Sequence, residues 1–297
     1  MTNASDQTGP ETGPALISAS QLAEAINQDG LHILDASLHL PAAKRDARAD
    51  YEAGHIPGAQ FLDLASLVDE SAPLSNTFPP FAKVQARLSA LGVAPGERIV
   101  LYDDSALRSS ARAWVILRAY GIANVAILDG GLDAWRAKDR ELRAMEAVPH
   151  DTGLEALKRE PKGVVTKSDV LANLDSGEFQ VLDARAADRV YGLGTDPVHG
   201  GQNGRIPGSL NLPFGLVFNP DGTYKSPENL RAAFEEAGID WQRPVITSCG
   251  SGVTASVLLV AMHLAGKDDV SLYDGSWSEW GADPDTPKAQ GPQDGPA

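Results

Sequence analysis

The sequence repeats one ordered set of short motifs at a spacing of about half of its 297 residues. Three motifs of the first half return in the second half: Leu34-Asp35-Ala36 as Leu182-Asp183-Ala184, Ile56-Pro57-Gly58 as Ile206-Pro207-Gly208, and Leu128-Asp129-Gly130 as Tyr273-Asp274-Gly275. Chance similarity does not preserve the order of several motifs, so the pattern predicts two homologous domains in tandem. At roughly 150 residues per domain, the chain is long enough for two domains that each bury a core.

The repeat and the local composition divide the chain into five segments. Both ends are rich in Pro, Gly and polar residues, and they bury too little apolar surface to offset the entropy lost on ordering. A charged segment that contains proline lies between the two copies, as expected of a linker on the surface. The predicted segments are a flexible N-terminal tail (1–14), a first domain (15–140), a linker (141–163), a second domain (164–281) and a flexible C-terminal tail (282–297).

Each half alternates short β-branched or aliphatic runs with helical patterns. This alternation is typical of the α/β class, in which helices flank a parallel sheet. The strands predicted in the second half lie at 180–184, 209–212, 244–248 and 270–273. A buried helix is predicted at 253–265, because apolar residues cover most of its circumference and Gly266 follows it.

The net charge argues against two classes of partner. The chain has 25 Lys and Arg against 40 Asp and Glu, a formal charge of −15, so most of its surface repels nucleic acid and anionic membranes. The aliphatic run at 257–262 is far too short to cross a bilayer, and residues 2–14 show no secretory signal. We expect no nucleic-acid or membrane partner, and an anionic substrate must meet local positive charge.

Cys249 is the only cysteine in the sequence. A single cysteine excludes an internal disulfide and every zinc site that needs two or more cysteines from one chain. The spacing His-x-x-x-His is also absent, so no metal site is predicted. A lone thiol fits a reducing compartment, and we therefore expect the protein in the cytoplasm.

The position of Cys249 points to a nucleophile. It follows the strand at 244–248 and precedes Gly250-Ser251-Gly252-Val253-Thr254, where the buried helix begins. The start of a helix offers unpaired N–H groups, cysteines there ionise more readily, and the thiolate is the nucleophilic form. The two glycines let the loop turn its N–H groups inward around an anion. The alternative is a buried cysteine that acts as a small hydrophobic residue, but strand, glycine-rich loop and helix coincide here. In the first copy, the same place holds Asp103.

From about residue 15 to 281, the chain resembles tandem-domain sulfurtransferases of the rhodanese superfamily. The resemblance rests on Cys249-Gly250-Ser251-Gly252-Val253-Thr254, on Gly54-His55-Ile56-Pro57-Gly58, and on the motif from Tyr273 to Trp280. It implies two similar α/β domains, the first inactive and the second catalytic, with the site facing the cleft between them. It further implies a small anionic sulfur donor, a persulfide on Cys249, and a thiol, a dithiol protein or cyanide as acceptor, without a metal or organic cofactor.

The resemblance also assigns substrate contacts. Arg189 matches the family arginine that holds the carboxylate of the donor, and the alternative for it is an ion pair with Asp188 or Glu235. Arg205 stands where the family usually has histidine and is expected to supply a second positive charge. The second carboxylate-binding arginine of the family would fall near His199 or Gly200, and neither is arginine.

The active loop departs from the family pattern in its partners. Ser251 matches a serine that works with a histidine and an acid of the first domain, but those two places hold Asn76 and Ala65. Without the relay, Ser251 donates directly to the donor or to the persulfide, and Thr254 is a second candidate for this role. Arg112, which matches a family position in the inactive copy, is expected to pair at the domain junction and to be structural.

Three classes of function remain to be compared. A cysteine phosphatase needs an arginine six residues after the cysteine, and Ala255 occupies that place, so the residues argue against it. A sulfur-binding module without turnover is the second class. Sulfurtransferase is the third and best supported, with 3-mercaptopyruvate favoured as donor by the uncharged Gly250-Ser251 pair and thiosulfate as the alternative.

Overall fold

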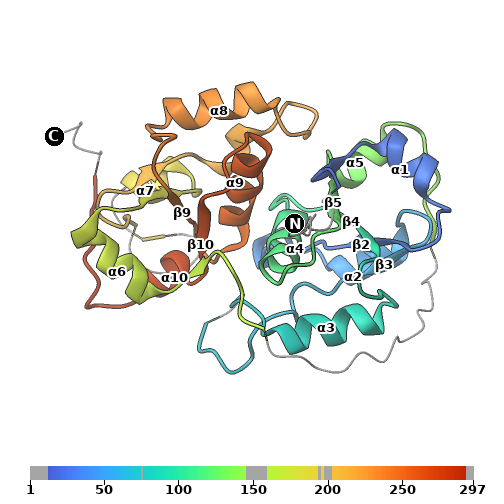
Figure 1. Ribbon diagram of the computed structural model, residues 1–297, viewed down its shortest axis with the longest axis horizontal. Coiled ribbons are helices and arrows are strands. Elements are labelled where there is room, and N and C mark those ends of the chain that lie inside the picture. Colours follow the sequence, from blue (N-terminus) through green and yellow to red (C-terminus); the bar gives the residue numbers. More distant parts are fainter. Residues whose placement is uncertain (1–12, 75, 145–158, 193–194, 197–202, 292–297) are drawn as a thin grey trace, which may run out of the picture.

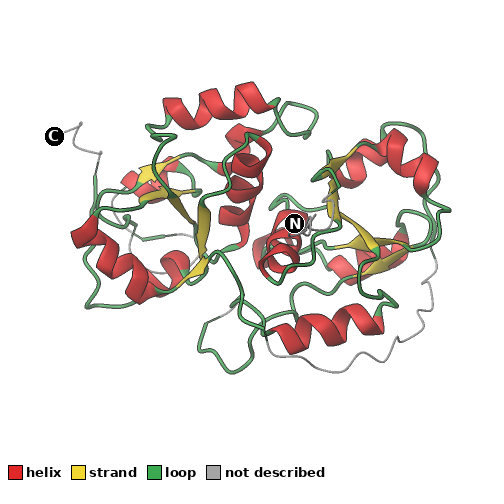
Figure 2. Ribbon diagram, in the orientation of Figure 1, coloured by secondary structure: helices red, strands yellow, loops and turns green. Residues whose placement is uncertain are grey.

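The computed structural model describes residues 13–74, 76–144, 159–192, 195–196 and 203–291. They form two similar α/β domains, each with a parallel sheet and helices on both faces (Figures 1 and 2). The strand orders are β1-β5-β4-β2-β3 and β6-β10-β9-β7-β8. Because β6 to β10 repeat the order of β1 to β5, the second sheet has the topology of the first. The predicted α/β class and the duplication are confirmed.

The elements of the first domain are β1 (Leu16–Ile17), α1 (Ala19–Ala25), β2 (Leu31–Asp35), η1 (Pro41–Ala43), α2 (Ala47–Ala53), β3 (Ala59–Phe61), α3 (Phe81–Ala90), β4 (Arg98–Tyr102), α4 (Ser110–Ala119), β5 (Val125–Leu128) and α5 (Gly131–Arg136). Those of the second are β6 (Val164–Val165), α6 (Lys167–Ser176), β7 (Gln180–Asp183), α7 (Ala187–Tyr191), β8 (Leu210–Asn211), η2 (Phe214–Val217), α8 (Pro227–Glu236), β9 (Val245–Ser248), α9 (Val253–Leu264), β10 (Val270–Tyr273) and α10 (Ser276–Trp280). The four strands and the buried helix predicted for the second half are all present, with ends shifted by one residue at most.

Local sequence explains where equivalent helices begin. Ser18 before α1 and Thr166 before α6 each form a capping box, in which the hydroxyl accepts an N–H from the third helical residue. In turn, the side chains of Gln21 and Asp169 accept the main-chain N–H of Ser18 and Thr166. Each box satisfies N–H groups that the first helical turn leaves unpaired. The same capping chemistry therefore starts the same helix in both copies.

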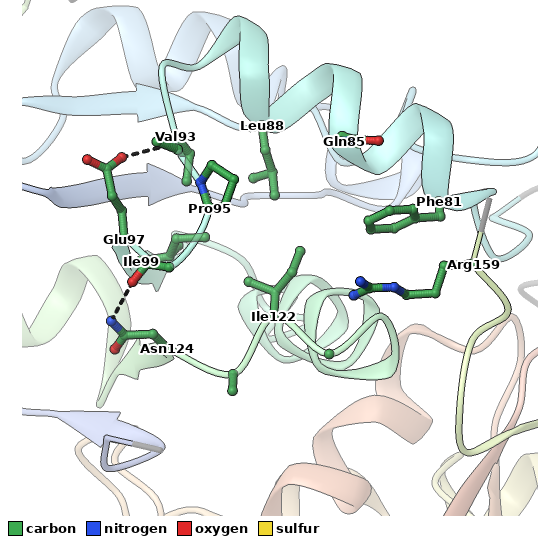
Figure 3. Close-up of a pocket in the computed structure, with 14 residues that line it drawn as sticks. Phe81, Gln85, Leu88, Val93, Pro95, Glu97, Ile99, Ile122, Asn124 and Arg159 are labelled. Carbon is green, nitrogen blue, oxygen red and sulfur yellow. Dashed lines mark hydrogen bonds between the residues drawn. The ribbon is translucent and has the colours of Figure 1, made fainter. Parts of the chain in front are cut away.

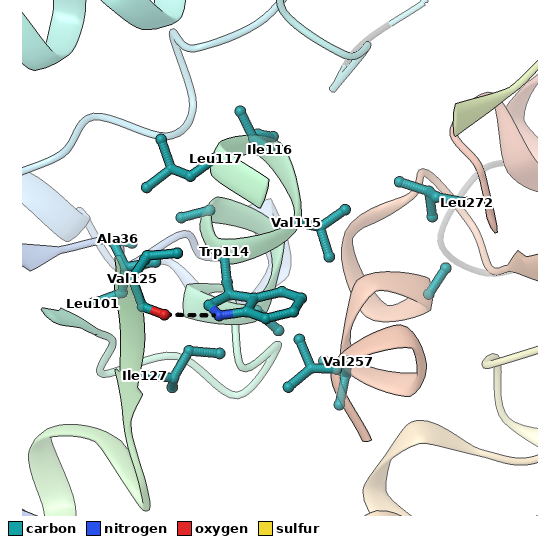
Figure 4. Packing of buried hydrophobic residues seen from close by; sticks show 14 of the residues in the cluster. Ala36, Leu101, Trp114, Val115, Ile116, Leu117, Val125, Ile127, Val257 and Leu272 are labelled. Atoms are coloured by element: carbon teal, nitrogen blue, oxygen red, sulfur yellow. Dashed lines mark hydrogen bonds between the residues drawn. The ribbon is translucent and has the colours of Figure 1, made fainter. Parts of the chain in front are cut away.

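One hydrophobic core runs from the first domain into the second. Figure 4 shows Trp114 and Val115 of α4 beside Val257 of α9, and all three belong to one cluster of buried residues. The Trp114 indole donates to the carbonyl of Val125 at 3.2 Å, which ties α4 back to its own sheet. Two smaller clusters lie separately in the first and second domains. The domains therefore meet through α4 and α9, and α9 is the helix that follows Cys249.

The C-terminal segment differs from its prediction. Residues 282–291 were expected to be a flexible tail, but Thr286 is buried and the Trp280 indole donates to the carbonyl of Pro287 at 2.8 Å. Ala289 forms an isolated β-bridge with Arg205. The prediction was wrong for these residues because main-chain and polar side-chain bonds hold the segment, and apolar composition does not reveal them. Residues 1–12, 145–158 and 292–297 of the predicted tails and linker lie outside the described residues.

Within the described part of the chain, no helix combines the length and apolar character that a membrane crossing needs.

Candidate active site

Cys249 lies in the turn between β9 and α9. Residues 249–254, which include this turn and the first residues of α9, are called the Cys249 loop. The cysteine is a free thiol and is 1% exposed, so a donor must enter the protein to reach the sulfur. Gly252 has φ 76°, a left-handed conformation that glycine adopts without strain, and it allows the chain to turn into α9. The strand and the helix predicted on either side of Cys249 are thus present. The third predicted feature, the glycine-rich loop, is the turn that Gly252 allows between them.

The carbonyl groups of the Cys249 loop point toward α10. The carbonyl of Cys249 accepts the N–H of Trp277 at 3.0 Å, and that of Gly250 accepts the N–H of Ser278 at 2.8 Å. In a trans peptide the N–H points opposite to the C=O, so the next N–H groups of the loop face away from α10. Within the described residues, no protein acceptor bonds the N–H groups of 250–254. They form an N–H cradle for an anion at the start of a helix.

Ser276 supports the loop through its side chain, which sequence reasoning missed. The N–H of Cys249 donates to Ser276 Oγ at 3.0 Å, and the same hydroxyl donates to the carbonyl of Tyr273 at 2.8 Å. Ser276 has φ 47°, which is rare for a residue with a Cβ. The closing motif from Tyr273 to Trp280 was the available signal, because it drew attention to the segment without showing what it contacts.

Residues of the first domain border the loop. Asn76 Nδ2 reaches Ser251 Oγ at 3.5 Å, a long hydrogen bond between the two domains. Ala65, which stands at the family's acid position, is exposed and offers no functional group. Arg112 Nη1 lies 2.6 Å from Asp274 Oδ1, so Arg112 pairs at the domain junction as expected. The structure thus brings Asn76 to the predicted serine.

Arg189 is held by an internal carboxylate. Its Nη2 donates to Asp196 Oδ2 at 2.8 Å, and its Nε also donates to this carboxylate. Asp196 is fully buried, and Arg185 Nη1 approaches it at 3.5 Å. The sequence left Asp188 or Glu235 as an alternative partner of Arg189, whereas the structure pairs Arg189 with Asp196. His199 and Gly200 lie outside the described residues.

Arg185 and Arg205 are both buried in the second domain. Arg185 pairs with Asp183 at 2.7 Å and lies over the ring of Trp277 at 4.5 Å, so its guanidinium is held within the second domain. Arg205 is 6% exposed, lies over the ring of Tyr191 at 5.0 Å and donates to the carbonyl of Gly291 at 2.5 Å. The sequence predicts that Arg205 supplies a positive charge to the substrate site. In the structure, its guanidinium packs against the C-terminal segment.

Asp103 occupies the place of the thiol in the first domain. Its carboxylate accepts the N–H of Ser105 at 3.0 Å and the N–H of Ser110, at the start of α4, at 2.9 Å. Asp103 is buried, and burial raises the pKa of its carboxyl. An N–H group at the start of α4 is therefore bonded by a side chain of the protein, whereas those of residues 250–254 have no protein acceptor among the described residues.

A cavity of about 420 Å³ in the first domain offers a different environment (Figure 3). Its wall comes from α3, from the turns before β4 and β5, and from Arg159. Most of its lining residues are apolar, among them Phe81, Leu88, Val93, Ile99 and Ile122. None of its residues belongs to the Cys249 loop, and none carries a thiol. Across the described residues, no three or more His, Cys, Asp or Glu side chains come together as metal ligands would.

The fold and the site define a two-domain α/β protein with a buried cysteine at the start of a helix in its second domain. The family model described as "Rhodanese-like domain" matches residues 18–138 and 166–283. The chain therefore belongs to the rhodanese family, and the resemblance seen in the sequence is confirmed.

Relatives with known names extend over nearly the whole chain. The 3-mercaptopyruvate sulfurtransferase of Rattus norvegicus is 38% identical over 277 residues, which cover 91% of this chain and 93% of that protein. A thiosulfate sulfurtransferase of Cricetulus griseus is 37% identical, over 93% of this chain and 96% of that protein. The crystal structure of SseA from Escherichia coli, a 3-mercaptopyruvate sulfotransferase with the rhodanese fold, matches with TM-score 0.80 and 34% identity. That match covers 89% of this chain and 99% of SseA.

Proposed function

We propose that this protein is a sulfurtransferase that moves a sulfane sulfur from 3-mercaptopyruvate to a thiol or cyanide acceptor through a persulfide on Cys249. The observation that carries the proposal is the buried thiol at the start of α9, followed by N–H groups of residues 250–254 that have no protein acceptor in the described part. The relatives named as sulfurtransferases support it.

In the first half-reaction, the Cys249 thiolate attacks the sulfur of 3-mercaptopyruvate. A sulfur–sulfur bond forms, the carbon–sulfur bond of the donor breaks, and pyruvate leaves as its enolate and takes up the proton of the donor thiol at carbon. The persulfide carries the negative charge on its outer sulfur. The N–H cradle of the Cys249 loop is suited to stabilise that charge, because its donors are oriented before the reaction begins.

In the second half-reaction, an acceptor thiolate or cyanide attacks the outer sulfur of the persulfide. The sulfur–sulfur bond to Cys249 breaks, the cysteine leaves as a thiolate, and the enzyme returns to its starting state. A dithiol protein can take the sulfur on one thiol and release it as sulfide by forming a disulfide with the other. Splitting the transfer into two displacements is ordinary nucleophilic catalysis. A reducing compartment such as the cytoplasm would keep the lone thiol available.

Arg189 is proposed to anchor the carboxylate of the donor. A guanidinium binds a carboxylate with two parallel bonds and so fixes its orientation. Because Asp196 accepts bonds from Nε and Nη2 of Arg189, the donor has to share the guanidinium with Asp196 or displace it. Ser251 is proposed to donate to the donor or the persulfide, with its own hydroxyl bonded by Asn76. Arg205 is proposed to supply a second positive charge near the donor, from a guanidinium that also donates to the carbonyl of Gly291.

Replacement of Cys249 by Ser tests the assignment. The variant is expected to lose turnover with every donor, and mass spectrometry of the wild type is expected to show one added sulfur atom on Cys249 after donor treatment. Sulfur transfer retained by Cys249→Ser contradicts the proposal. A persulfide that forms on the wild type but is never discharged to any acceptor favours the sulfur-binding module instead.

Thiosulfate remains the alternative donor, because a thiosulfate sulfurtransferase is about as similar to this chain as the mercaptopyruvate enzymes are. The uncharged Gly250-Ser251 pair favours 3-mercaptopyruvate. The test is kcat/KM for both donors on one preparation, since specificity is the ratio of these values. A value for thiosulfate equal to or above that for 3-mercaptopyruvate overturns the choice of donor.

A further inference from the structure

Two hydrogen bonds join the domains in a reciprocal way. Asp274 Oδ2 in the second domain accepts the N–H of Phe78 in the first at 2.6 Å. Asp129 Oδ1 in the first domain accepts the N–H of Tyr224 in the second at 2.8 Å. The two aspartates are equivalent in the repeat, and each N–H donor stands three residues before an equivalent helix, α3 or α8. The domain interface thus has two related sides, one at the Cys249 loop and one at Asp103.

The side at the Cys249 loop carries an ion pair that the other side lacks in the described residues. Arg112 Nη1 lies 2.6 Å from Asp274 Oδ1, and Arg112 Nη2 donates to the carbonyl of Asn76 at 2.8 Å. The side chain of Arg112 is 4% exposed and that of Asp274 is 12% exposed. Asp129 has no ion pair within 4 Å among these residues. One carboxylate therefore ties α4 and the segment 76–78 to the turn that precedes α10.

The ion pair lies against the backbone of Gly252. A methyl group built on Gly252 would come within 3.0 Å of Arg112 Nη1 and 2.9 Å of Asp274 Oδ1 and O. No ordinary side chain fits, so the glycine is required both by its φ and by this close approach. Through Asn76, the same arginine also connects to Ser251. The charges of the interface thus touch the loop that forms the N–H cradle.

Domain association alone does not explain a buried ion pair at this place. Removing two charges from water is costly, and such a pair often stabilises a protein no more than apolar residues of similar size do. The apolar packing of α4 on α9 already joins the domains. What this buried ion pair adds is one defined geometry, which Arg112 Nη2 fixes further through its bond to Asn76, and here the geometry includes the Cys249 loop.

We propose that Arg112 and Asp274 are positioning residues, through which the domain without a nucleophile holds Gly252 and the N–H cradle in the shape that persulfide formation needs. This inference rests on the proposed function, because it assigns the two residues a part in the sulfur transfer proposed for Cys249. Arg112 and Asp274 do not touch the sulfur in this scheme. They act through the loop.

The test compares Arg112→Met and Asp274→Asn with Asp129→Asn as the matched control. Asp274→Asn keeps the size of the side chain and an acceptor for Phe78, while it removes the charge that Arg112 pairs with. Single-turnover persulfide formation is measured against donor concentration. The maximal rate is expected to fall about 10- to 100-fold in Arg112→Met and Asp274→Asn, because small displacements of reacting groups slow a reaction by factors of this size. The donor concentration at half-saturation is expected to stay within about threefold, because Arg189 still binds the donor.

Arg112→Lys supplies a rescue that a purely structural role would not show. Lysine can restore the charge beside Asp274 but not the simultaneous bond to Asn76, so its rate is expected to lie between those of Arg112→Met and the wild type. Thermal unfolding of every variant tests whether the fold is retained at the assay temperature. Asp129→Asn is expected to keep the wild-type rate.

A second readout separates this proposal from the proposed function. The alkylation rate of Cys249 by iodoacetamide at one pH reads the loop without any donor, and it is expected to change by more than roughly threefold in Arg112→Met and Asp274→Asn only. Wild-type alkylation and persulfide rates in both variants overturn the proposal, and so does an equal loss in Asp129→Asn. A wild type that forms no persulfide but shows the alkylation pattern contradicts the sulfurtransferase function and leaves the positioning roles supported.

Discussion

The N–H of Cys249 donates to the hydroxyl of Ser276 at 3.0 Å, and this bond joins the turn that carries the thiol to the start of α10. Ser276 reaches this position with φ 47°, in a region of backbone space that costs a residue with a side chain on the order of 1–3 kcal/mol. Both residues are buried. The protein thus stores backbone strain next to Cys249 and uses the hydroxyl to satisfy an N–H that water cannot reach.

Replacement of Ser276 by Ala is expected to lower kcat by about tenfold, because the buried N–H of Cys249 loses its acceptor, at a cost of about 1–3 kcal/mol. Ser276→Gly relieves the strain but also removes the hydroxyl, so it is expected to lose activity as well while it unfolds at a higher temperature than Ser276→Ala. Ser278→Ala is the matched control: it removes a hydroxyl that donates to the carbonyl of Gly250, but this carbonyl keeps the N–H of Ser278 as a donor, so kcat is expected to change little. Wild-type kcat in Ser276→Ala would show that the bond does not serve the reaction.

Arg189→Ala is expected to reduce kcat/KM for 3-mercaptopyruvate by about 10- to 100-fold, mainly through KM. The reason is that a charge-assisted bond to the donor carboxylate contributes about 1.5–3 kcal/mol. Steady-state kinetics with the donor varied measure this change. The alkylation rate of Cys249 serves as a control, because Arg189 is not expected to shape the loop. An unchanged KM in Arg189→Ala would mean that another group holds the carboxylate.

The features that sequence patterns predicted are local or repeated. The order of motifs indicated the duplication, and the run from strand through glycines to helix indicated the surroundings of Cys249. Both depend on neighbours along the chain. The common topology of the two sheets confirms the duplication, and β9 and α9 lie on either side of Cys249 as predicted. The pairing of Arg112 at the domain junction was also predicted, because the family resemblance placed it there.

The features that sequence patterns missed depend on contacts between distant segments. Ser276 lies 27 residues from Cys249, and its unusual φ follows from the fold rather than from a serine's own preference. Asp196 was not considered as the partner of Arg189, since no periodic pattern shows which carboxylate a loop brings near. The contacts of Arg205 with the C-terminal segment were not predicted, because they arise from chain packing and not from neighbours in the sequence.

The buried carboxyl of Asp35 predicts a dependence of stability on pH. Burial raises its pKa to about 6, against the lowering effect of hydrogen bonds from Ser37. Because the pKa of Asp35 is higher in the folded than in the unfolded protein, folding favours the protonated carboxyl. The stability that this carboxyl contributes is therefore fully present below about pH 4 and is lost as the pH rises through 6. Asp183, the equivalent residue in the second domain, has the Arg185 guanidinium beside it.

Asp35→Asn keeps the size of the side chain but does not ionise. The free energy of unfolding of the wild type minus that of the variant is therefore expected to fall by about 3 kcal/mol between pH 4 and pH 7, as a shift of about two pKa units implies. Urea denaturation of both proteins at four pH values in this range measures the difference, and other carboxyl groups cancel in it. A difference that is constant with pH contradicts the prediction.

The C-terminal segment predicts a stability effect that a flexible tail would not have. The indole N–H of Trp280 donates to Pro287, and Thr286 Oγ1 donates to the carbonyl of Trp280 at 2.5 Å, while Lys167 Nζ pairs with Asp283 at 2.6 Å. Removal of residues 282–297 leaves the fully buried Trp280 with an N–H and a C=O without these partners, and each such loss costs about 1–3 kcal/mol.

Truncation after Gly281 is accordingly expected to lower the melting temperature by roughly 5–10 °C, as a loss of about 3 kcal/mol does in a chain of this size. Calorimetry or circular dichroism measures the shift. Because Trp280 ends the helix that begins at Ser276, the shorter protein is also expected to lose sulfur transfer at a temperature below its own unfolding. Equal melting temperatures for the truncated and full-length proteins would show that residues 282–291 do not stabilise the fold.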